Sequence, residues 1–249
     1  MSDRYFITTF GCQQNEADSE RIASFYEARG LVRAENMREA QVIILNTCVV
    51  RERAAEKVFG LVRNIRRGLQ GNTDARIVVT GCLIGAASRV PGGKMMKSLR
   101  ARLPDVDFLP LEEVGFEYAP KRTSLRSVSV PISNGCNNFC SYCIVPFSRG
   151  KERSRPFEEI LNEVEAAVRN GAEEVMLLGQ NVNSYGADLL LEKLGEKEEY
   201  VLPDGRSVKP VMVKHLSRHR IPTLFPFLLE AVAMFPEVRK VSFISSNPW

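Results

Sequence analysis

The stretch from residue 42 to residue 48 reads Val42-Ile43-Ile44-Leu45-Asn46-Thr47-Cys48, an apolar run rich in β-branched residues that ends in a cysteine. Two similar runs flank it along the chain, Tyr5-Phe6-Ile7-Thr8-Thr9-Phe10-Gly11-Cys12 and Ile77-Val78-Val79-Thr80-Gly81-Cys82. Apolar runs without polar alternation are typical of strands that are buried on both faces, as in parallel sheets. The three segments therefore predict three strands of one buried parallel sheet.

Helical patterns separate these predicted strands. From Asp18 to Arg29 the apolar residues recur on one helical face and Gly30 supplies a stop signal, and a second such pattern runs from Arg51 to Arg67. Between residues 84 and 104 we expect a loop, broken at Pro91-Gly92-Gly93, and then a helix. Strands that alternate with helices predict an α/β domain with an open parallel sheet, of the flavodoxin or Rossmann-like kind.

A second α/β pattern follows a polar stretch, residues 117–127, which we interpret as a linker. The expected strands are residues 128–132, 175–178 and 241–244, and the expected helices are residues 157–170 and 224–235. Residues 188–221 read as an irregular insertion. The predicted organisation is an N-terminal domain over residues 1–122 and a second domain over residues 123–249.

The composition favours an ordinary globular protein. Of the 249 residues, 44% are hydrophobic, but no apolar run approaches the eighteen or so residues that span a bilayer, and the N-terminus lacks a signal-peptide pattern. We therefore expect a cytoplasmic protein. The net charge of +4 permits a polyanionic partner without requiring one. The basic residues cluster in three places, and a solvated surface is the alternative for each: Arg63, Arg66, Arg67; Arg149, Lys151, Arg153, Arg155; and Lys209, Lys214, Arg218, His219, Arg220.

The six cysteines carry most of the functional information. In a reducing compartment, cysteines are more often ligands or catalysts than members of disulfides. Cys12, Cys48 and Cys82 are about one strand–helix unit apart, so they should converge at the carboxyl edge of the parallel sheet. This predicts a metal site with an open fourth position. Inert buried cysteines are one alternative and a catalytic thiol is another, although His215 and His219 lie far along the chain.

A second cysteine motif lies at residues 136–143, which read Cys136-Asn137-Asn138-Phe139-Cys140-Ser141-Tyr142-Cys143. Its short, unequal gaps let one loop hold three corners of a [4Fe–4S] cube. The fourth iron then remains open to the amino and carboxylate groups of a small molecule, to which a reduced cluster can donate an electron. A structural zinc site is the alternative, but such a site usually takes four ligands.

This motif resembles that of the radical S-adenosylmethionine superfamily, and its surroundings are similar to the methylthiotransferases. The similar segments are Gly135–Gly150 continuing to Ser154-Arg155-Pro156, Thr9–Asn15 followed by Asp18-Ser19-Glu20, and Asn46–Ala54 followed by Glu56-Lys57-Val58. The resemblance spans nearly the whole chain apart from residues 188–221. Residues Leu178–Gly186 and Val50–Glu52 resemble the branch of tRNA-2-methylthio-N6-dimethylallyladenosine synthases (MiaB-like).

The resemblance implies a transferase that adds a methylthio group to C2 of N6-isopentenyl-adenosine at position 37 of tRNA. Within the family, the alternatives are an aspartate of a ribosomal protein and threonylcarbamoyl-adenosine in tRNA. A non-catalytic iron–sulfur or zinc module that binds RNA is the alternative from another class. The implied partners are tRNA and an electron donor such as flavodoxin or ferredoxin. We expect no membrane association and treat the chain as a monomer.

The resemblance also implies two [4Fe–4S] clusters and S-adenosyl-L-methionine as cofactors. Cys136, Cys140 and Cys143 would hold the catalytic cluster, which cleaves S-adenosylmethionine to a 5′-deoxyadenosyl radical. The auxiliary cluster, which carries or donates the sulfur, would be held by Cys12, Cys48 and Cys82. Further cofactor-binding residues would be Tyr142, Gly179, Gln180 and Asn181. Arg149, Arg153 and Arg155 would contact tRNA phosphates or a cofactor carboxylate, with an exposed face as the alternative.

For the second domain, the resemblance implies a partial radical-SAM (β/α) barrel. The last residues, Ser245-Ser246-Asn247-Pro248-Trp249, are similar to a Thr-Ser-His-Pro turn of the family, with asparagine where histidine is usual. Relatives usually continue through further strand–helix units and a small RNA-binding β-barrel. We therefore expect a truncated barrel with an exposed strand edge.

Overall fold

The structure is a computed structural model that describes residues 3–50, 52–193, 199–215 and 219–245, and it divides into two compact units. The first unit comprises residues 1–121 and 142–150, and the second comprises residues 122–141 and 151–249. The chain therefore leaves the second unit between Ser141 and Tyr142, contributes nine residues to the first unit, and then returns.

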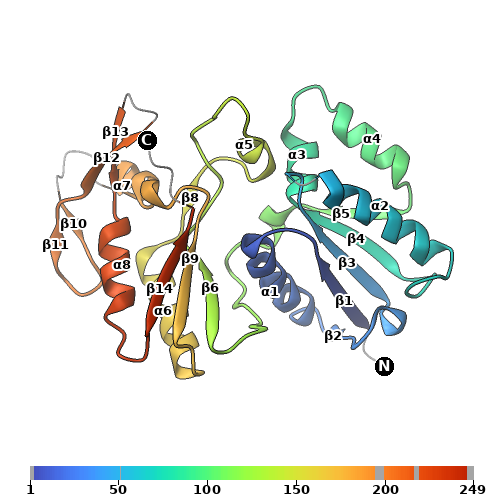
Figure 1. The fold of residues 1–249 in the computed structure, drawn as a ribbon, viewed down its shortest axis with the longest axis horizontal. Helices are drawn as coiled ribbons and strands as arrows, with labels where there is room; N and C mark the ends of the chain where they lie inside the picture. The colour runs from blue at the N-terminus through green and yellow to red at the C-terminus, as the bar shows by residue number, and fades with distance from the viewer. Residues whose placement is uncertain (1–2, 51, 194–198, 216–218, 246–249) are drawn as a thin grey trace. The chain divides into compact units, whose positions relative to one another are not determined.

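The first unit is built on a parallel sheet of five strands in the order β2-β1-β3-β4-β5 (Figure 1). Its strands are β1 (Arg4–Thr9), β2 (Val32–Arg33), β3 (Val42–Thr47), β4 (Arg76–Gly81) and β5 (Val106–Leu109). The three predicted strands are confirmed as β1, β3 and β4, which are neighbours in the sheet. The strands β2 and β5 were not predicted, because two and four residues are too short to give a periodic pattern.

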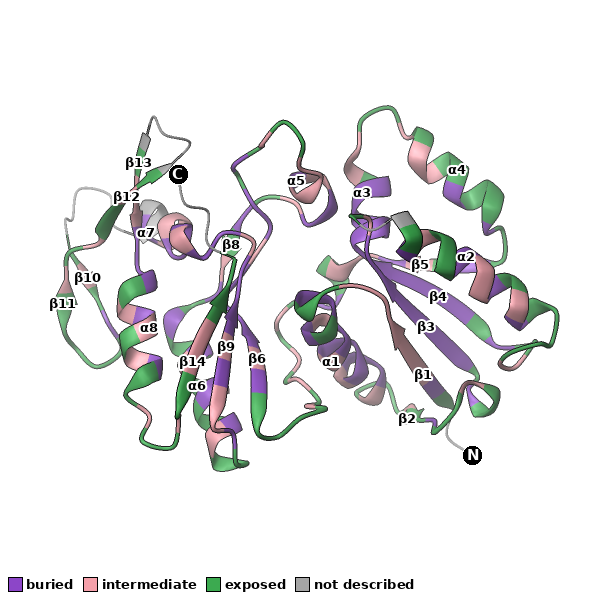
Figure 2. Ribbon diagram, viewed as in Figure 1, coloured by how far each residue is buried: buried purple, intermediate pink, exposed green. Residues whose placement is uncertain are grey.

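Both faces of this sheet are covered by helices, which explains why β3 is buried at every position (Figure 2). Ile43 and Leu45 are buried in one core with side chains of α2 (Glu52–Arg66), α3 (Cys82–Arg89) and α4 (Lys94–Arg102). Val42 and Ile44 point the other way, into a core shared with α1 (Gln13–Glu27). The alternation along one strand therefore separates the two layers of helices.

Two helix predictions in this unit need correction. The first helix begins at Gln13 rather than Asp18, because Cys12 is its N-cap and the chain turns into the helix soon after β1 ends. The residues after Cys82 form the helix α3 rather than a loop, since Leu83 and Ile84 are buried in the core. The predicted break at residues 91–93 and the helix after it, α4, are confirmed. Two 3-10 turns, η1 (Met37–Glu39) and η2 (Leu111–Glu113), complete the unit's connections.

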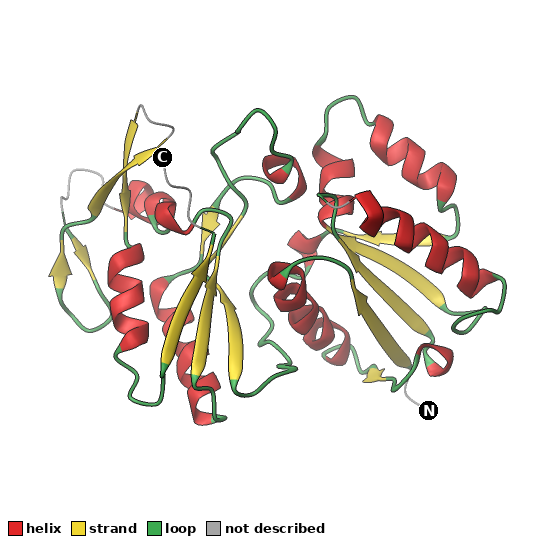
Figure 3. Cartoon of the chain, in the orientation of Figure 1, coloured by secondary structure: helices red, strands yellow, loops and turns green. Residues whose placement is uncertain are grey.

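The second unit contains a parallel sheet of three strands in the order β14-β9-β6, with helices packed against it (Figure 3). The strands are β6 (Ser127–Pro131), β9 (Glu174–Leu178) and β14 (Lys240–Ile244), and the predicted helices are α6 (Phe157–Arg169) and α8 (Phe225–Ala233). Val130, Leu177, Ile160 and Leu228 meet in one core and are fully buried. These strands and helices confirm the strand–helix–strand order read from the sequence.

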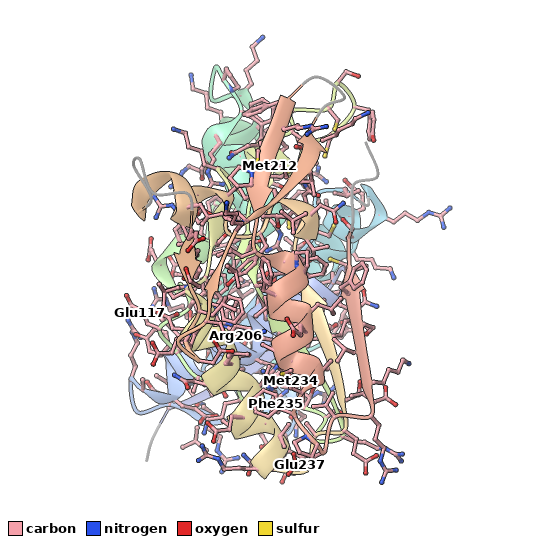
Figure 4. The ribbon with its side chains drawn as sticks, turned by 90° about the vertical axis from the view of Figure 1, so that its left-hand side faces the viewer. Glu117, Arg206, Met212, Met234, Phe235 and Glu237 are labelled. Atoms are coloured by element: carbon pink, nitrogen blue, oxygen red, sulfur yellow. The ribbon has the colours of Figure 1, made fainter. Side chains whose placement is uncertain are left out.

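The expectation that residues 188–221 are irregular is wrong. The described residues of this range, which leave out 194–198 and 216–218, lie mostly in a helix and two antiparallel strand pairs: α7 (Ala187–Lys193), β10 (Tyr200–Val201) paired with β11 (Ser207–Val208), and β12 (Val211–His215) paired with β13 (His219–Thr223). Leu190 and Leu202 are buried in the core of the second unit, so core packing orders this segment. Figure 4 views this side and labels Arg206, in the first hairpin, and Met212, in the second. The charge-rich residues 194–198 lie outside the described residues.

Two other sequence expectations concern the membrane and the last residues. No helix within the described residues has the length and hydropathy needed to cross a bilayer. Of the segment that resembles a family turn, residues 246–249 lie outside the described residues. The strand β14 forms one edge of its sheet, and Phe243 on it is 43% exposed.

Candidate functional site

The structure places Cys12, Cys48 and Cys82 at the carboxyl ends of three neighbouring parallel strands. Thr47 at the end of β3 pairs with Gly81 at the end of β4, so Cys48 and Cys82 follow adjacent, paired positions. Cys12 lies three residues after the end of β1, which pairs with the other side of β3. This edge is where open parallel sheets place their ligands.

A buried amide network fixes the chain around these cysteines. The Asn15 side chain donates to the Asn46 side chain at 3.1 Å, and Asn46 donates back to the Asn15 carbonyl at 2.8 Å. Asn46 also donates to the Ser19 hydroxyl at 2.9 Å, and the Cys12 thiol donates to Asn15 Oδ1 at 3.4 Å. The start of α1 is thereby tied to the end of β3. Sequence reasoning gave no role to these side chains, although they lie within the quoted motifs.

Gly81 lets the ends of β3 and β4 approach each other in front of Cys82. Its φ is +92°, and a Cβ at this position would lie 2.4 Å from both Asn46 Oδ1 and the Thr47 carbonyl oxygen. Only glycine fits this conformation and this space without a rearrangement. The glycine before Cys82 is therefore needed to bring Cys48 and Cys82 to the same edge of the sheet.

The three thiols interact electrostatically. Burial raises the pKa of the Cys82 thiol, the nearby Arg149 guanidinium lowers it, and Asp18, Cys48 and Cys12 raise it further. Cys48 and Cys82 are buried whereas Cys12 is exposed, and all six cysteines are free thiols. Among the described residues, no group of three or more His, Cys, Asp or Glu side chains is arranged to hold a single metal ion. A donor set of three thiols without histidine is of the soft kind that iron–sulfur clusters take, as zinc also does.

The second cysteine motif lies in a loop whose base is closed by a short antiparallel ladder, β7 (Ser133–Asn134) with β8 (Arg153–Ser154). Cys136 is buried, and Cys140 and Cys143 are partly exposed. Phe139 adopts a φ of +47°, in the left-handed region that non-glycine residues rarely occupy. Such backbone strain is commonly found at functional sites.

The motif is divided between the two units. Cys136 and Cys140 belong to the second unit, whereas Cys143 and the predicted cofactor residue Tyr142 belong to the first. The Tyr142 side chain is exposed. The ligand role of all six cysteines and the role of Tyr142 stay predictions.

The predicted cofactor residues Gly179, Gln180 and Asn181 follow β9 directly. Asn181 is buried, and its Oδ1 atom has no hydrogen-bond partner among the described residues; the same holds for Ser133 Oγ. A Cβ on Gly179 would lie 2.9 Å from Ser133 Oγ, so the two segments are in close contact. Buried polar atoms without partners are costly unless a ligand or water satisfies them. This end of β9 therefore fits a polar ligand such as S-adenosylmethionine, and Ser133 is a residue that sequence reasoning missed.

The alternative that Arg149 and Arg155 lie on an exposed face is wrong, whereas their contact with tRNA or a cofactor stays a prediction. Both are buried and both are paired with acids of the protein. Arg149 Nη2 lies 2.7 Å from Asp18 Oδ2, and Arg155 Nη1 lies 2.8 Å from Glu163 Oε2. A charge that is buried this deeply needs a partner within the fold. Arg153 is exposed and remains available to a phosphate.

Glu152 is a buried carboxyl group in the second unit that sequence reasoning missed. Its backbone N–H donates to Asn137 Oδ1 at 3.1 Å, and its side chain accepts a hydrogen bond from the Ser184 hydroxyl. Burial raises the pKa of Glu152 from 4.5 to about 7, the Ser184 hydrogen bond opposes this rise, and the charge of Asp188 adds to it. No motif signals a buried glutamate of this kind, because only the tertiary fold removes it from water.

We expect Glu152→Gln to make the free energy of unfolding less dependent on pH between pH 4.5 and pH 7. A carboxyl pKa that is raised in the folded state destabilises the fold as the pH rises from the unfolded value toward the folded value. The wild type should therefore lose about 2–3 kcal/mol of stability between pH 4.5 and pH 7 that the variant does not lose. Urea unfolding at several pH values measures the difference. The exposed Glu159→Gln is the control, and equal pH dependence in wild type and Glu152→Gln would contradict the expectation.

Comparison of the sequence with known proteins identifies two family matches. Residues 4–100 match the family described as "Uncharacterized protein family UPF0004", and residues 130–230 match the radical SAM superfamily. A tRNA-2-methylthio-N(6)-dimethylallyladenosine synthase of Dictyoglomus thermophilum is 40% identical over 215 residues, which cover 75% of this chain and 47% of that protein. The enzyme of the same name from Caldicellulosiruptor saccharolyticus is 36% identical and covers 98% of this chain and 50% of that protein.

Among solved structures, the radical S-adenosylmethionine methyltransferase TsrM from Kitasatospora setae, with cobalamin and a [4Fe–4S] cluster bound, is 16% identical. The match has a TM-score of 0.46 and covers 82% of this chain and 54% of that one. The present chain spans about half the length of the curated relatives it matches.

The chain is therefore a radical S-adenosylmethionine protein with an N-terminal UPF0004 domain. It belongs to the radical S-adenosylmethionine methylthiotransferase family. This confirms the predicted family and α/β fold class, and the superfamily match confirms S-adenosyl-L-methionine as the superfamily's cofactor.

Proposed function

We propose that this protein transfers a methylthio group to C2 of N6-isopentenyl-adenosine at position 37 of tRNA. The observation that carries the proposal is the presence of two separate sets of three cysteines, one at the edge of the first sheet and one in the loop after β7. The names of the relatives, which are tRNA-2-methylthio-N(6)-dimethylallyladenosine synthases, support the choice of substrate. A ribosomal-protein aspartate or another tRNA adenosine are the alternatives within the family.

In this proposal, residues 1–122 form the methylthiotransferase domain and residues 123–249 form the radical domain. Cys136, Cys140 and Cys143 would hold a [4Fe–4S] cluster, which supplies the electron for cleaving S-adenosylmethionine. Ser133 Oγ and Asn181 Oδ1 would satisfy polar groups of S-adenosylmethionine, because both atoms are buried without partners among the described residues. The Cys12, Cys48 and Cys82 thiols would hold the second cluster, which would supply the sulfur.

The proposed partners follow from this chemistry. Electrons would come from a small carrier such as a flavodoxin or ferredoxin, and the second substrate is tRNA. Free thiols and a tRNA substrate both favour the reducing cytoplasm as the location.

The hairpin β12–β13 offers a basic surface for a polyanion. Lys214 and Arg220 are directly opposite each other in its register, and both are exposed. Neither forms a salt bridge with another described residue. Like charges that face each other across two strands are destabilising, and a phosphate between them would relieve the repulsion. Met212, on the same face of β12 as Lys214, is 51% exposed and adds an apolar contact.

We expect Lys214→Glu combined with Arg220→Glu to weaken tRNA binding about tenfold or more at low salt. The reason is that two phosphate contacts, with their released counterions, are replaced by repulsion, so the dependence of log K on log salt should flatten by about two. Fluorescence anisotropy with labelled tRNA measures both quantities. Lys94→Glu with Lys97→Glu, on the exposed side of α4, makes the same charge change elsewhere. Equal losses in the two double variants would contradict a contact specific to the hairpin.

Anaerobic reconstitution of the chain with iron and sulfide tests the enzyme against a binding module. About eight irons per chain, together with reductive cleavage of S-adenosylmethionine to 5′-deoxyadenosine, supports the proposal. One or two bound zinc ions and no cleavage would support a non-catalytic module instead. Mass spectrometry of tRNA nucleosides from cells that lack the gene then tests the substrate, and unchanged methylthio-adenosine levels would count against tRNA.

A further inference from the structure

Arg149 is a charged residue buried beside the N-terminal cysteines, although it follows the cysteine motif of the radical domain in sequence. Its side chain is 2% exposed and forms an ion pair with Asp18 of α1 at 2.7 Å. Burial alone would lower the pKa of the guanidinium, but the charges of Asp18, Cys82 and Cys12 outweigh burial, so the pKa is raised. Arg149 is thus within electrostatic reach of two of the three thiols at the sheet edge.

The position of Arg149 is fixed by the short helix α5 (Val145–Ser148), which packs on α3. Arg89 of α3 donates hydrogen bonds to the carbonyl oxygens of Phe147 and Ser148, at 3.2 and 3.3 Å. A Cβ on Gly85 would lie 2.0 Å from the Ser148 carbonyl oxygen, so the two backbones touch there. Since α3 begins with Cys82, the helix that carries one thiol also holds the segment that carries Arg149.

We propose that Arg149 is a positioning residue of the N-terminal cysteine site, and that its buried positive charge raises the reduction potential of the iron–sulfur cluster bound there. The inference rests on the proposed function in one respect, that Cys12, Cys48 and Cys82 hold such a cluster. Adding an electron makes a cluster more negative, and a fixed, buried cation nearby stabilises that state. Asp18 acts with the opposite sign, so the pair sets the net charge beside the cluster.

The test uses the full chain with Cys136, Cys140 and Cys143 replaced by alanine, so that one cluster remains. Reductive titration followed by EPR gives its midpoint potential in this background. Arg149→Gln is expected to shift the reduction equilibrium about tenfold or more toward the oxidised cluster, or about 59 mV to lower potential for a one-electron couple. Arg149→Lys should retain part of the effect. Arg155→Gln, which breaks an equally buried arginine–carboxylate pair in the second unit, should leave the potential unchanged.

Asp18→Asn separates an electrostatic role from a structural one. Because it removes the opposing negative charge and keeps Arg149, it should move the potential upward, opposite to Arg149→Gln. It also replaces Arg149→Gln as the decisive variant if the latter fails to fold, as judged by circular dichroism and iron content. A potential that is unchanged or lowered in Asp18→Asn would overturn the inference. Failure of the background chain itself to bind a cluster would overturn the assignment of the N-terminal site and the inference with it.

Discussion

The Cys140→Ala variant is expected to lose all reductive cleavage of S-adenosylmethionine while keeping about half of the iron of the reconstituted wild type. Removing one of three thiolates leaves the loop unable to hold a cube by three corners, so about four irons should be lost. The first unit does not contain Cys140, so Cys12, Cys48 and Cys82 should still bind their cluster. Iron analysis and chromatography of 5′-deoxyadenosine measure the two effects on the same sample.

Cys48→Ala is the matched control, because it removes one thiolate from the other set. This variant should also lose about four irons, but it should still cleave S-adenosylmethionine and should fail to form methylthio-adenosine. The two variants thus distinguish cleavage of S-adenosylmethionine from transfer of the methylthio group. Retention of cleavage by Cys140→Ala, or loss of cleavage in Cys48→Ala with the iron at the radical site intact, would contradict the assignment of the two sites.

Gly85→Ala is expected to destabilise the first unit by about 2–4 kcal/mol. Helix propensity alone would make this change stabilising, since glycine lies inside α3. The added methyl group, however, would lie 2.0 Å from the Ser148 carbonyl oxygen, which is backbone and cannot rotate away. Relief therefore requires α5 to move away from α3, and Arg149 to move with it. Thermal unfolding followed by circular dichroism measures the loss.

Gly60→Ala provides the matched comparison for this prediction. Gly60 also lies inside a helix, α2, but a Cβ there would meet nothing within 4 Å. This variant should gain about 0.5–1 kcal/mol from helix propensity. If both glycine variants changed stability in the same direction and by the same amount, the close contact between α3 and α5 would not be a determinant of stability.

Much of the fold followed from local patterns. The run Val42–Leu45 is hydrophobic at every position because each of its side chains faces a covered side of the sheet, and that pattern is visible in the sequence. The helix α3 was missed because it has only eight residues, several of them small, and the consecutive residues 82–87 are all buried, so the sequence shows no helical alternation of polar and apolar residues. The strand pairs β10–β11 and β12–β13 were missed because their strands have only two and five residues, and the sequence does not show that Leu202, beside β10, is buried in the core.

The sequence by itself determined the six cysteines, their two spacings and the strand ends at which three of them lie, because these depend on residue type and on local periodicity. The tertiary structure alone decided the environment of those groups. Burial of Arg149 against Asp18, of Glu152 against Ser184, and of Asn181 Oδ1, which has no partner among the described residues, arises from the tertiary fold rather than from local sequence. Desolvation and long-range charge interactions leave no local pattern in the sequence. A motif can therefore predict which residues are ligands, but not the burial and the charges around them.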